Sequence, residues 1–306
     1  MKLRSEKVRR AYALAFAAVL AALVFAVSCG GGARTLSAKS GKPERIISLT
    51  PSTTEILYGV GAFDRVVAVS DYCTYPPDVS KLPRVGGWNN PNMEQIASLR
   101  PDLVIFSDAQ AQFVKDKVEA AGIRTLAVPS QTLEDAFKSI EMVGQATGEE
   151  EAARKLLEQT RASVETVRLK TEKLPRLRVL CVVDRVPGTL RDLYTAGEQS
   201  FIAQLIRAAG GEPLSPPSRQ NWGKMQKEAV VALDPDVVID LMMQKPAGGL
   251  EEDTLAVWGE LSSLRAVRDK RVYTIREQTT LHPSQFVGDT ARKFAELIHP
   301  EAFEKK

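Results

Sequence analysis

The chain has 306 residues, of which 44% are hydrophobic and 26% charged, a globular balance with enough apolar material for two cores. The formal charge of +3 is concentrated at the N-terminus, because the first 28 residues carry five basic side chains and one acidic side chain, which leaves −1 for the rest. No block of like charge follows, so the composition argues against a nucleic-acid-binding face.

The first segment has the pattern of an export signal. A basic stretch is followed by a run of apolar residues and then by Cys29. The tetrapeptide Ala-Val-Ser-Cys that ends at Cys29 resembles a bacterial lipobox. We therefore expect residues 1–28 to be a lipoprotein signal peptide, Cys29 to carry the lipid anchor, and residues 29–43 to form a flexible extracytoplasmic tether. An uncleaved anchor helix is the alternative.

Between residues 44 and 146, short apolar strands alternate with helices, which is typical of parallel α/β packing. Ser52 and Glu55 have the spacing of a capping box for the first helix. The expected strands are 45–49, 66–70, 103–106 and 125–128, and the expected helices are 53–58, 93–99, 113–121 and 133–143. This segment is predicted to be an N-terminal lobe.

The run from Thr147 to Leu174 is predicted to be one long interdomain helix. Thr147 and Glu150 have the spacing of a second capping box, acidic residues crowd the first turn, and basic residues crowd the last. Pro175 ends the run. At 1.5 Å per residue the helix would be about 40 Å long, longer than a small lobe is wide. A surface helix of a single domain is the alternative.

From residue 175 to residue 306 the alternation returns, which predicts a C-terminal α/β lobe. Its expected strands are 177–183, 237–241 and 271–275, its expected helices are 195–209, 228–233, 258–264 and 286–298, and residues 213–217 are expected to be a loop. Cys73 and Cys181 are expected to be free thiols, with Cys181 buried. Neither cysteine nor histidine has the spacing of a metal site.

The two halves contain a repeat. The twelve-residue segments that begin at Glu94 and Glu228 align without gaps at an offset of 134, and the same offset carries Trp88 to Trp222. The Leu-x-Pro-Asp-x-Val-Ile portion is explained by a helix that ends before a buried strand. The glutamates and tryptophans have no such explanation. Each half is therefore predicted to carry one aromatic side chain and one carboxylate at equivalent points.

Candidate ligand-binding residues are those expected beyond the carboxyl ends of the strands, where open α/β lobes bind their ligands. They are Ser52, Thr53, Tyr72 and Trp88 in the first lobe and Tyr194, Trp222 and His282 in the second. Two facing lobes would hold a flat, largely apolar ligand between aromatic faces. Packing under loops is the alternative for the tryptophans and tyrosines, and an ordinary loop residue is the alternative for His282.

Glu94 and Glu228 are candidate docking residues, because each is expected in the first turn of a helix. Exposed ion pairs contribute only about 1 kcal/mol each, so the two carboxylates would orient a two-fold partner rather than hold it. Stabilisation of the helix dipole is the alternative.

The sequence resembles the substrate-binding proteins of bacterial ABC importers for vitamin B12, haem and ferric siderophores, and most of all the vitamin B12-binding members. The resemblance covers about residues 45–298 and rests on the motifs Ile-Ser-Leu-Thr-Pro-Ser-Thr-Thr-Glu, Ser-Asp-Tyr with Tyr-Pro-Pro, Pro-Arg-Val-Gly-Gly-Trp and the two Glu…Pro-Asp segments. Two stretches depart from the vitamin B12-binding pattern: 107–110, which lacks an aromatic residue, and 278–284.

The resemblance implies the class III fold, in which two Rossmann-like lobes joined by a backbone helix close little on binding and hold the ligand edge-on. It implies that Tyr72, Trp88, Tyr194 and Trp222 line the cleft. It also implies that Glu94 and Glu228 dock on arginines of the two permease subunits.

The leading functional hypothesis is a monomeric, lipid-anchored binding protein that captures a corrinoid and delivers it to an ABC permease with its ATPase, without a resident cofactor or metal. Haem is an alternative ligand, with Tyr72 or His282 as an axial ligand of the iron. A ferric siderophore is another, for which Arg185 and Arg191 are candidate contacts. An enzyme is not expected, since the sequence has no Gly-x-Ser-x-Gly, His-Glu-x-x-His or P-loop motif.

Overall fold

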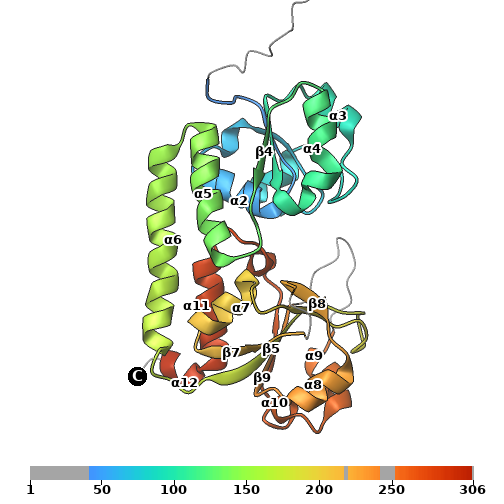
Figure 1. Cartoon of the computed structure of the whole chain (residues 1–306), viewed down its shortest axis with the longest axis vertical. Coiled ribbons are helices and arrows are strands. Elements are labelled where there is room, and N and C mark those ends of the chain that lie inside the picture. The colour runs from blue at the N-terminus through green and yellow to red at the C-terminus, as the bar shows by residue number, and fades with distance from the viewer. Residues whose placement is uncertain (1–40, 217–219, 242–251, 305–306) are drawn as a thin grey trace, which may run out of the picture. The chain divides into compact units, whose positions relative to one another are not determined.

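Two sheets, one in each half of the chain, form the framework of the protein (Figure 1). The computed structural model describes residues 41–216, 220–241 and 252–304. Cys29 and the predicted signal peptide lie outside the described residues.

The first lobe contains a four-stranded parallel sheet in the order β2-β1-β3-β4. Its strands are apolar because helices cover both faces. Helices α2 and α5 pack on one face and α3 and α4 on the other. The elements are β1 (Ile46–Ser48), α2 (Pro51–Gly59), β2 (Val66–Val69), α3 (Met93–Ser98), β3 (Leu103–Ser107), α4 (Ala111–Ala120), β4 (Thr125–Val128) and α5 (Leu133–Thr147), with 3₁₀ turns η1 (Phe63–Arg65), η2 (Pro77–Lys81) and η3 (Asp108–Gln110).

The second lobe contains a six-stranded sheet in the order β10-β9-β5-β6-β8, and β7 pairs with the first half of β5. Strands β7 and β9 run parallel to β5, and β10 runs parallel to β9. Strand β6 is antiparallel to both β5 and β8. Its strands are β5 (Leu177–Asp184), β6 (Tyr194–Ala196), β7 (Gly211–Leu214), β8 (Trp222–Lys224), β9 (Val237–Leu241) and β10 (Val272–Ile275).

Helices also cover both faces of the second sheet. Helices α7 (Phe201–Ala208) and α11 (Val287–Ile298) pack on one face, and α8 (Lys227–Leu233), α9 (Thr254–Trp258) and α10 (Arg265–Arg268) pack on the other. The remaining elements are η4 (Gly259–Leu261), η5 (Gln278–Leu281) and α12 (Pro300–Phe303).

Helix α6 (Glu150–Thr171) runs alongside both lobes (Figure 1). Ala153, near its start, is buried in the core of the first lobe, whereas Val164 and Val167 are buried in the core of the second. At 1.5 Å per residue its 22 residues span about 33 Å. Two α/β lobes with a connecting helix are therefore confirmed.

The boundary between α5 and α6 differs from the prediction. Thr147 does not begin the long helix but ends α5, where its hydroxyl donates to the carbonyl of Val143 at 2.7 Å. The chain then turns at Gly148, which has φ +72, a left-handed conformation that favours glycine. The predicted capping box of Thr147 and Glu150 is therefore wrong, and Glu149 precedes α6 without a side-chain cap.

Three other local predictions are wrong. Helix α2 begins at Pro51 after Thr50, so that Ser52 lies inside the helix and forms no capping box with Glu55. The predicted helix start at Thr195 is part of strand β6, and the Ser200 hydroxyl caps α7 by accepting from the Ala203 amide at 3.2 Å. The predicted loop from residue 213 overlaps strand β7.

None of the described helices combines the length and the apolar composition that a bilayer span requires.

Candidate functional site

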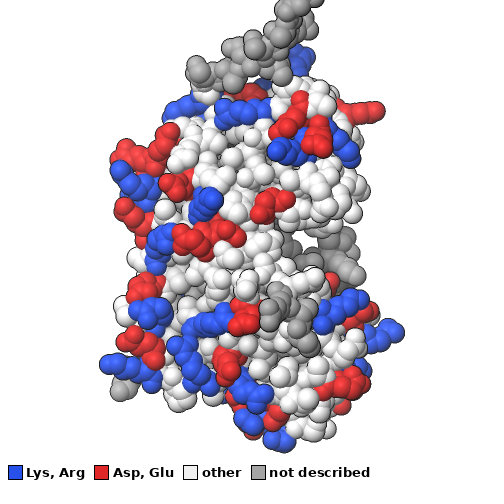
Figure 2. All heavy atoms as spheres, in the orientation of Figure 1, with Lys and Arg blue, Asp and Glu red and all other residues white. Residues whose placement is uncertain are grey.

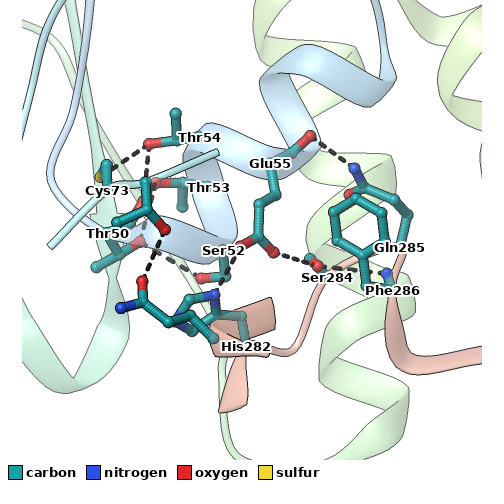
Figure 3. A network of polar contacts seen from close by, with 12 residues as sticks. Thr50, Ser52, Thr53, Thr54, Glu55, Cys73, His282, Ser284, Gln285 and Phe286 are labelled. Atoms are coloured by element: carbon teal, nitrogen blue, oxygen red, sulfur yellow. Dashed lines mark hydrogen bonds and ion pairs between the residues drawn. The ribbon is translucent and has the colours of Figure 1, made fainter. Parts of the chain in front are cut away.

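The two lobes meet at a buried carboxylate on α2, shown in Figure 3. Glu55 is 1% exposed, and its side chain points away from its own helix towards the second lobe. Its Oε1 lies 2.6 Å from Nδ1 of His282, and its Oε2 accepts a hydrogen bond from the Ser284 hydroxyl at 2.5 Å. The Gln285 amide donates to the backbone carbonyl of Glu55 at 2.8 Å. This cluster ties the start of α11 to α2.

The predicted first-lobe residues Ser52 and Thr53 lie beside this junction, on the first turn of α2. Thr53 has no exposed surface, and its hydroxyl bonds with the Ser48 hydroxyl at 2.6 Å and donates to the Thr50 carbonyl at 2.9 Å. Ser52 is 7% exposed and its hydroxyl lies 3.4 Å from that of Thr50. Of the two, only Ser52 therefore retains surface for a ligand.

Tyr72 and Trp88 are neighbouring exposed aromatic residues of the first lobe. Tyr72 follows β2, and its ring lies against the backbone of Gly87, since a Cβ atom on Gly87 would be 3.6 Å from Cε2 of Tyr72. The side chains of Tyr72 and Trp88 are 51% and 38% exposed. Both therefore offer an aromatic surface beyond the carboxyl ends of the strands.

Two polar side chains, the half-buried Arg84 and the buried Gln110, hold the loops that carry these aromatic residues. The Arg84 guanidinium donates to the carbonyl oxygens of Ser70 at 2.9 Å and Cys73 at 2.6 Å, on either side of Tyr72. The Gln110 amide donates to the carbonyl oxygen of Trp88 at 2.8 Å. Gln110 has no exposed surface, so the Trp88 loop is fixed by a hydrogen bond from the protein interior.

In the second lobe, Tyr194 and Trp222 lie in neighbouring strands. Tyr194 begins β6 and pairs with Asp184 at the carboxyl end of β5, and its side chain is 38% exposed. Trp222 begins β8 and pairs with Ala196, so it lies two residues further from that edge. The Trp222 ring packs edge-on against Phe201 with 5.8 Å between centroids. Trp222 is thus half-buried in a strand rather than free in a loop.

A second junction between the lobes lies beside Trp222. The Gln131 carbonyl accepts from the Phe201 amide at 2.8 Å, and its side-chain oxygen accepts from the Asn221 amide at 3.1 Å. The Leu133 amide donates to Oε1 of Gln204 at 3.0 Å. Trp222 and His282 therefore lie near the two junctions, whereas Tyr72, Trp88 and Tyr194 are the more exposed members of the predicted set.

The surface is indented between the two lobes in the space-filling view, and Lys and Arg are interspersed with Asp and Glu on this face (Figure 2). A separate cavity of about 520 Å³ lies between α5, α6 and α7 and is lined by Phe137, Val164, Arg161, Arg168, Arg176 and Arg207 among others. None of the predicted ligand-binding residues lines that cavity.

Glu94 and Glu228 occupy the same place in their respective helices. Each lies in the first turn, of α3 and α8 respectively, and each is exposed. Within the described ranges neither carboxylate has a hydrogen-bond or ion-pair partner. Helices α3 and α8 lie in different lobes, both on the side away from α6 (Figure 1).

The described residues contain no group of three or more His, Cys, Asp or Glu side chains arranged to hold a metal ion. Cys73 and Cys181 are both free and Cys181 is buried, as predicted, and the structure shows that Cys73 is buried too. Burial raises the pKa of each thiol above its ordinary value, although hydrogen bonds from Ser70 and Thr54 oppose the rise at Cys73.

A family model described as periplasmic binding protein matches residues 46–279. The chain is also 30% identical over 268 residues to the ABC transporter substrate-binding lipoprotein YvrC of Bacillus subtilis, a match that covers 86% of this chain and 82% of the relative. The chain belongs to the periplasmic binding protein family. The predicted family is therefore confirmed.

Other relatives of this periplasmic binding protein carry the names of specific ligands. The vitamin B12-binding protein of Yersinia pestis is 30% identical over 197 residues, which cover 64% of this chain and 69% of the relative. The solved structure of the vitamin B12 binding protein BtuF of Vibrio cholerae matches with a TM-score of 0.73 and 23% identity, covering 86% of this chain and 99% of BtuF. The heme-binding protein RhuT of Roseiflexus sp. RS-1 matches with a TM-score of 0.72 and 25% identity, covering 86% of this chain and 100% of RhuT. The likeness to BtuF concerns the fold alone.

The sequence-based prediction missed two positioning residues of this periplasmic binding protein. Glu55 was assigned to a local cap, although a single carboxylate inside Thr-Thr-Glu-Ile-Leu is a signal of a buried partner elsewhere. Gln110 had no recognisable signal, because its role is a hydrogen bond to a backbone carbonyl 22 residues away.

Proposed function

We propose that this periplasmic binding protein captures a corrinoid between its lobes and delivers it to an ABC permease. The observation that carries the proposal is the set of exposed aromatic side chains on the two lobes, Tyr72 and Trp88 on one and Tyr194 on the other. Aromatic faces bind flat, largely apolar molecules by burying their surface. The Yersinia pestis relative, named as a vitamin B12-binding protein, supports a corrinoid as that molecule.

Calorimetry with cyanocobalamin tests the ligand. We expect saturable heat with one site per chain, and we expect Trp88→Ala and Tyr194→Ala each to weaken binding by about tenfold or more, since each removes an aromatic contact. Trp258→Phe is a control for general damage, because Trp258 is fully buried in the second lobe and has no surface for a ligand. The absence of heat and of retained corrinoid absorbance would refute the corrinoid proposal.

Haem is the second candidate, favoured by His282 at the junction between the lobes and by the exposed Tyr72 of the first lobe. Either side chain can coordinate haem iron. A Soret band that appears when hemin is added, and that is lost in Tyr72→Phe or His282→Ala, would favour haem over a corrinoid.

A ferric siderophore has less support, because its anionic groups need free cationic side chains. Arg185, one of the two arginines considered for this role, is 8% exposed and is already paired with Asp240 and Glu252. Only Arg191 remains exposed.

We also propose that Glu94 and Glu228 dock on the two permease subunits. Their equivalent positions and their lack of partners among the described residues suit a two-fold receptor. The double variant Glu94→Arg/Glu228→Arg is expected to bind ligand as tightly as the wild type and to abolish uptake by cells. Glu158→Arg, an exposed charge reversal on α6, is the matched control and should leave uptake intact. Uptake that persists in the double variant would contradict the assignment.

The lipid anchor on Cys29 completes the proposal and places the protein on the outer side of the cell membrane. Mass spectrometry of the mature N-terminus from membranes tests it: we expect a diacylglyceryl-modified cysteine, and an unmodified or uncleaved N-terminus would refute it.

A further inference from the structure

The hydrogen-bond donors around Glu55 are determined by their chemistry. A carboxylate accepts hydrogen bonds and does not donate them, so the Ser284 hydroxyl must donate to Oε2 and Nδ1 of His282 must donate to Oε1. No lysine or arginine in the described part of the chain pairs with Glu55. The buried carboxylate is therefore held by two hydrogen bonds, one from Ser284 and one from His282.

This arrangement determines whether the other ring nitrogen, Nε2, donates or accepts hydrogen bonds. A neutral imidazole with its proton on Nδ1 has an unshared electron pair on Nε2, and a hydrogen bond from the first nitrogen to a carboxylate holds the ring in that tautomer. Nε2 of His282 has no hydrogen-bond partner among the described residues, and it is not one of their buried polar atoms that lack a partner. Nε2 thus reaches solvent as a hydrogen-bond acceptor.

The ring lies at the junction between the lobes. It sits next to Ser52 at the first turn of α2 (Figure 3) and its side chain is 17% exposed. The preceding 3₁₀ turn is held across the junction by the Thr74 hydroxyl, which donates to Oε1 of Gln278 at 2.7 Å. A ligand between the lobes would therefore meet Nε2 with its edge.

We propose that Glu55 makes His282 a hydrogen-bond acceptor in the ligand site, so that the site binds a ligand edge rich in neutral amide N–H groups and rejects an edge that carries carboxylates. Glu55 is a positioning residue that acts through His282. The inference rests on the proposed function and deepens it, because it supplies a basis for choosing between the two candidate ligands.

The two candidates present different groups to Nε2 at their edges. The periphery of a corrinoid carries primary amides, whose N–H groups can donate to Nε2, whereas haem carries two propionates. A propionate would place its unshared electron pairs against that of Nε2 and its charge near the buried carboxylate of Glu55. An unpaired buried acceptor and a close pair of like charges both weaken binding, so the site discriminates against the anionic edge.

The tautomer can be measured without any ligand. The chain contains only two histidines, so a sample labelled with ¹⁵N-histidine gives two separate imidazole spin systems in NMR. At about pH 8 we expect His282 to show a protonated Nδ1 and an unprotonated Nε2. A proton on Nε2 would overturn the inference whatever the protein binds.

The preference is measured with a matched pair of corrinoids. Dicyanocobinamide has amide side chains, and dicyanocobyrinic acid has carboxylic acids in their place. We expect the wild type to favour the amide form by more than about tenfold. In Glu55→Gln the new amide can donate to Nδ1, which moves the proton to Nε2, and we expect the ratio of the two affinities to fall by about tenfold. His282→Phe, which removes the acceptor but retains a ring, should lower the ratio in the same way.

Gln204→Leu is the control, because it removes an inter-lobe hydrogen bond, from the Leu133 amide at 3.0 Å, at the other junction and away from His282. It should leave the ratio unchanged. If Glu55 had only a structural role, Glu55→Gln would weaken the affinities for the amide and the acid corrinoid equally. The ratio of the two affinities would then stay unchanged in Glu55→Gln and His282→Phe, which would overturn the inference but not the proposed function. If the wild type binds neither corrinoid, the proposed function is wrong and so is the predicted preference for the amide form. The NMR measurement still determines the tautomer of His282 in that case.

Discussion

Arg185 and Asp240 form a buried ion pair in the second lobe, with 2.8 Å between Nε and Oδ2 and side chains that are 4% and 2% exposed. Arg185 follows β5 and Asp240 lies in β9, so the pair links neighbouring strands at their carboxyl ends. The Trp258 indole donates to the same carboxylate oxygen at 2.9 Å, and Glu252 pairs with the other side of the guanidinium. Burial raises the pKa of Asp240, although Trp258 and Arg185 oppose the rise.

We predict that Arg185→Leu lowers the free energy of unfolding by about 3–5 kcal/mol, because it leaves the Asp240 carboxylate buried without its cation. Denaturant unfolding at neutral pH measures the loss. Because burial raises the folded-state pKa of Asp240, protonation of this carboxyl as the pH is lowered should partly relieve the variant and narrow the difference in free energy of unfolding from the wild type. Arg292→Leu, which breaks an exposed helical pair, should cost at most about 1 kcal/mol. Equal losses in both variants would contradict the prediction.

Local patterns in the sequence predicted the architecture well. The charges at the two ends of the long run and the proline after it predicted the helix that the structure shows as α6, and the repeat placed Glu94 and Glu228 in the first turns of α3 and α8. These features succeed because helix periodicity and buried parallel strands are local in sequence. The repeated tryptophans are less alike, since Trp88 lies in a loop and Trp222 in the antiparallel strand β8.

The contacts between lobes could not be predicted in the same way. Glu55 and His282 are 227 residues apart, and Gln131 and Asn221 are 90 residues apart. A Ser-x-x-Glu spacing offers a local explanation, and the apolar neighbours of Glu55 signal a buried partner without identifying which distant residue it is. The same limit applies to Thr147, whose spacing to Glu150 suggests an N-cap. In the structure α5 ends at Thr147 and the chain turns at Gly148 in a left-handed conformation.

Helices α5 and α6 approach closely at Gly144 and Ala153. A Cβ atom on Gly144 would lie 2.2 Å from Cβ of Ala153, far inside any normal contact. We predict that Gly144→Ala destabilises the protein by about 1–3 kcal/mol through overpacking, despite the higher helix propensity of alanine. Denaturant unfolding measures it, with the exposed Gln145→Ala as a neutral control. The double variant Gly144→Ala/Ala153→Gly should recover most of the loss, and its failure to do so would argue against the steric explanation.

Gln110 supports Trp88 from a fully buried position without an exposed atom for a ligand. We predict that Gln110→Leu weakens corrinoid binding by about tenfold, because the Trp88 loop loses its hydrogen bond. The free energy of unfolding should change little, because the variant also removes the Gln110 side-chain oxygen, which is buried without a hydrogen-bond partner. Calorimetry and denaturant unfolding measure the two effects separately. Gln112→Leu, on the exposed side of α4, should change neither quantity. Unaltered affinity in Gln110→Leu would mean that the Trp88 loop holds its position without this bond.

The two buried thiols make stability depend on alkaline pH. The folded-state pKa of each thiol is raised, so the folded chain keeps protons that the unfolded chain releases above about pH 8.5. Stability is thus fully present below that pH and falls as the pH rises above it, by up to about 1.4 kcal/mol per pH unit for each thiol. We predict that the free energy of unfolding of the Cys29→Ser variant, in which Cys73 and Cys181 are the remaining cysteines, falls as the pH rises above about 8.5. The fall should be smaller when Cys73→Ala and Cys181→Ala are added to this variant. In the same background, a thiol reagent at about pH 8 should react with neither cysteine in the native protein and with both after denaturation. Rapid reaction in the native state would contradict the burial on which the prediction depends.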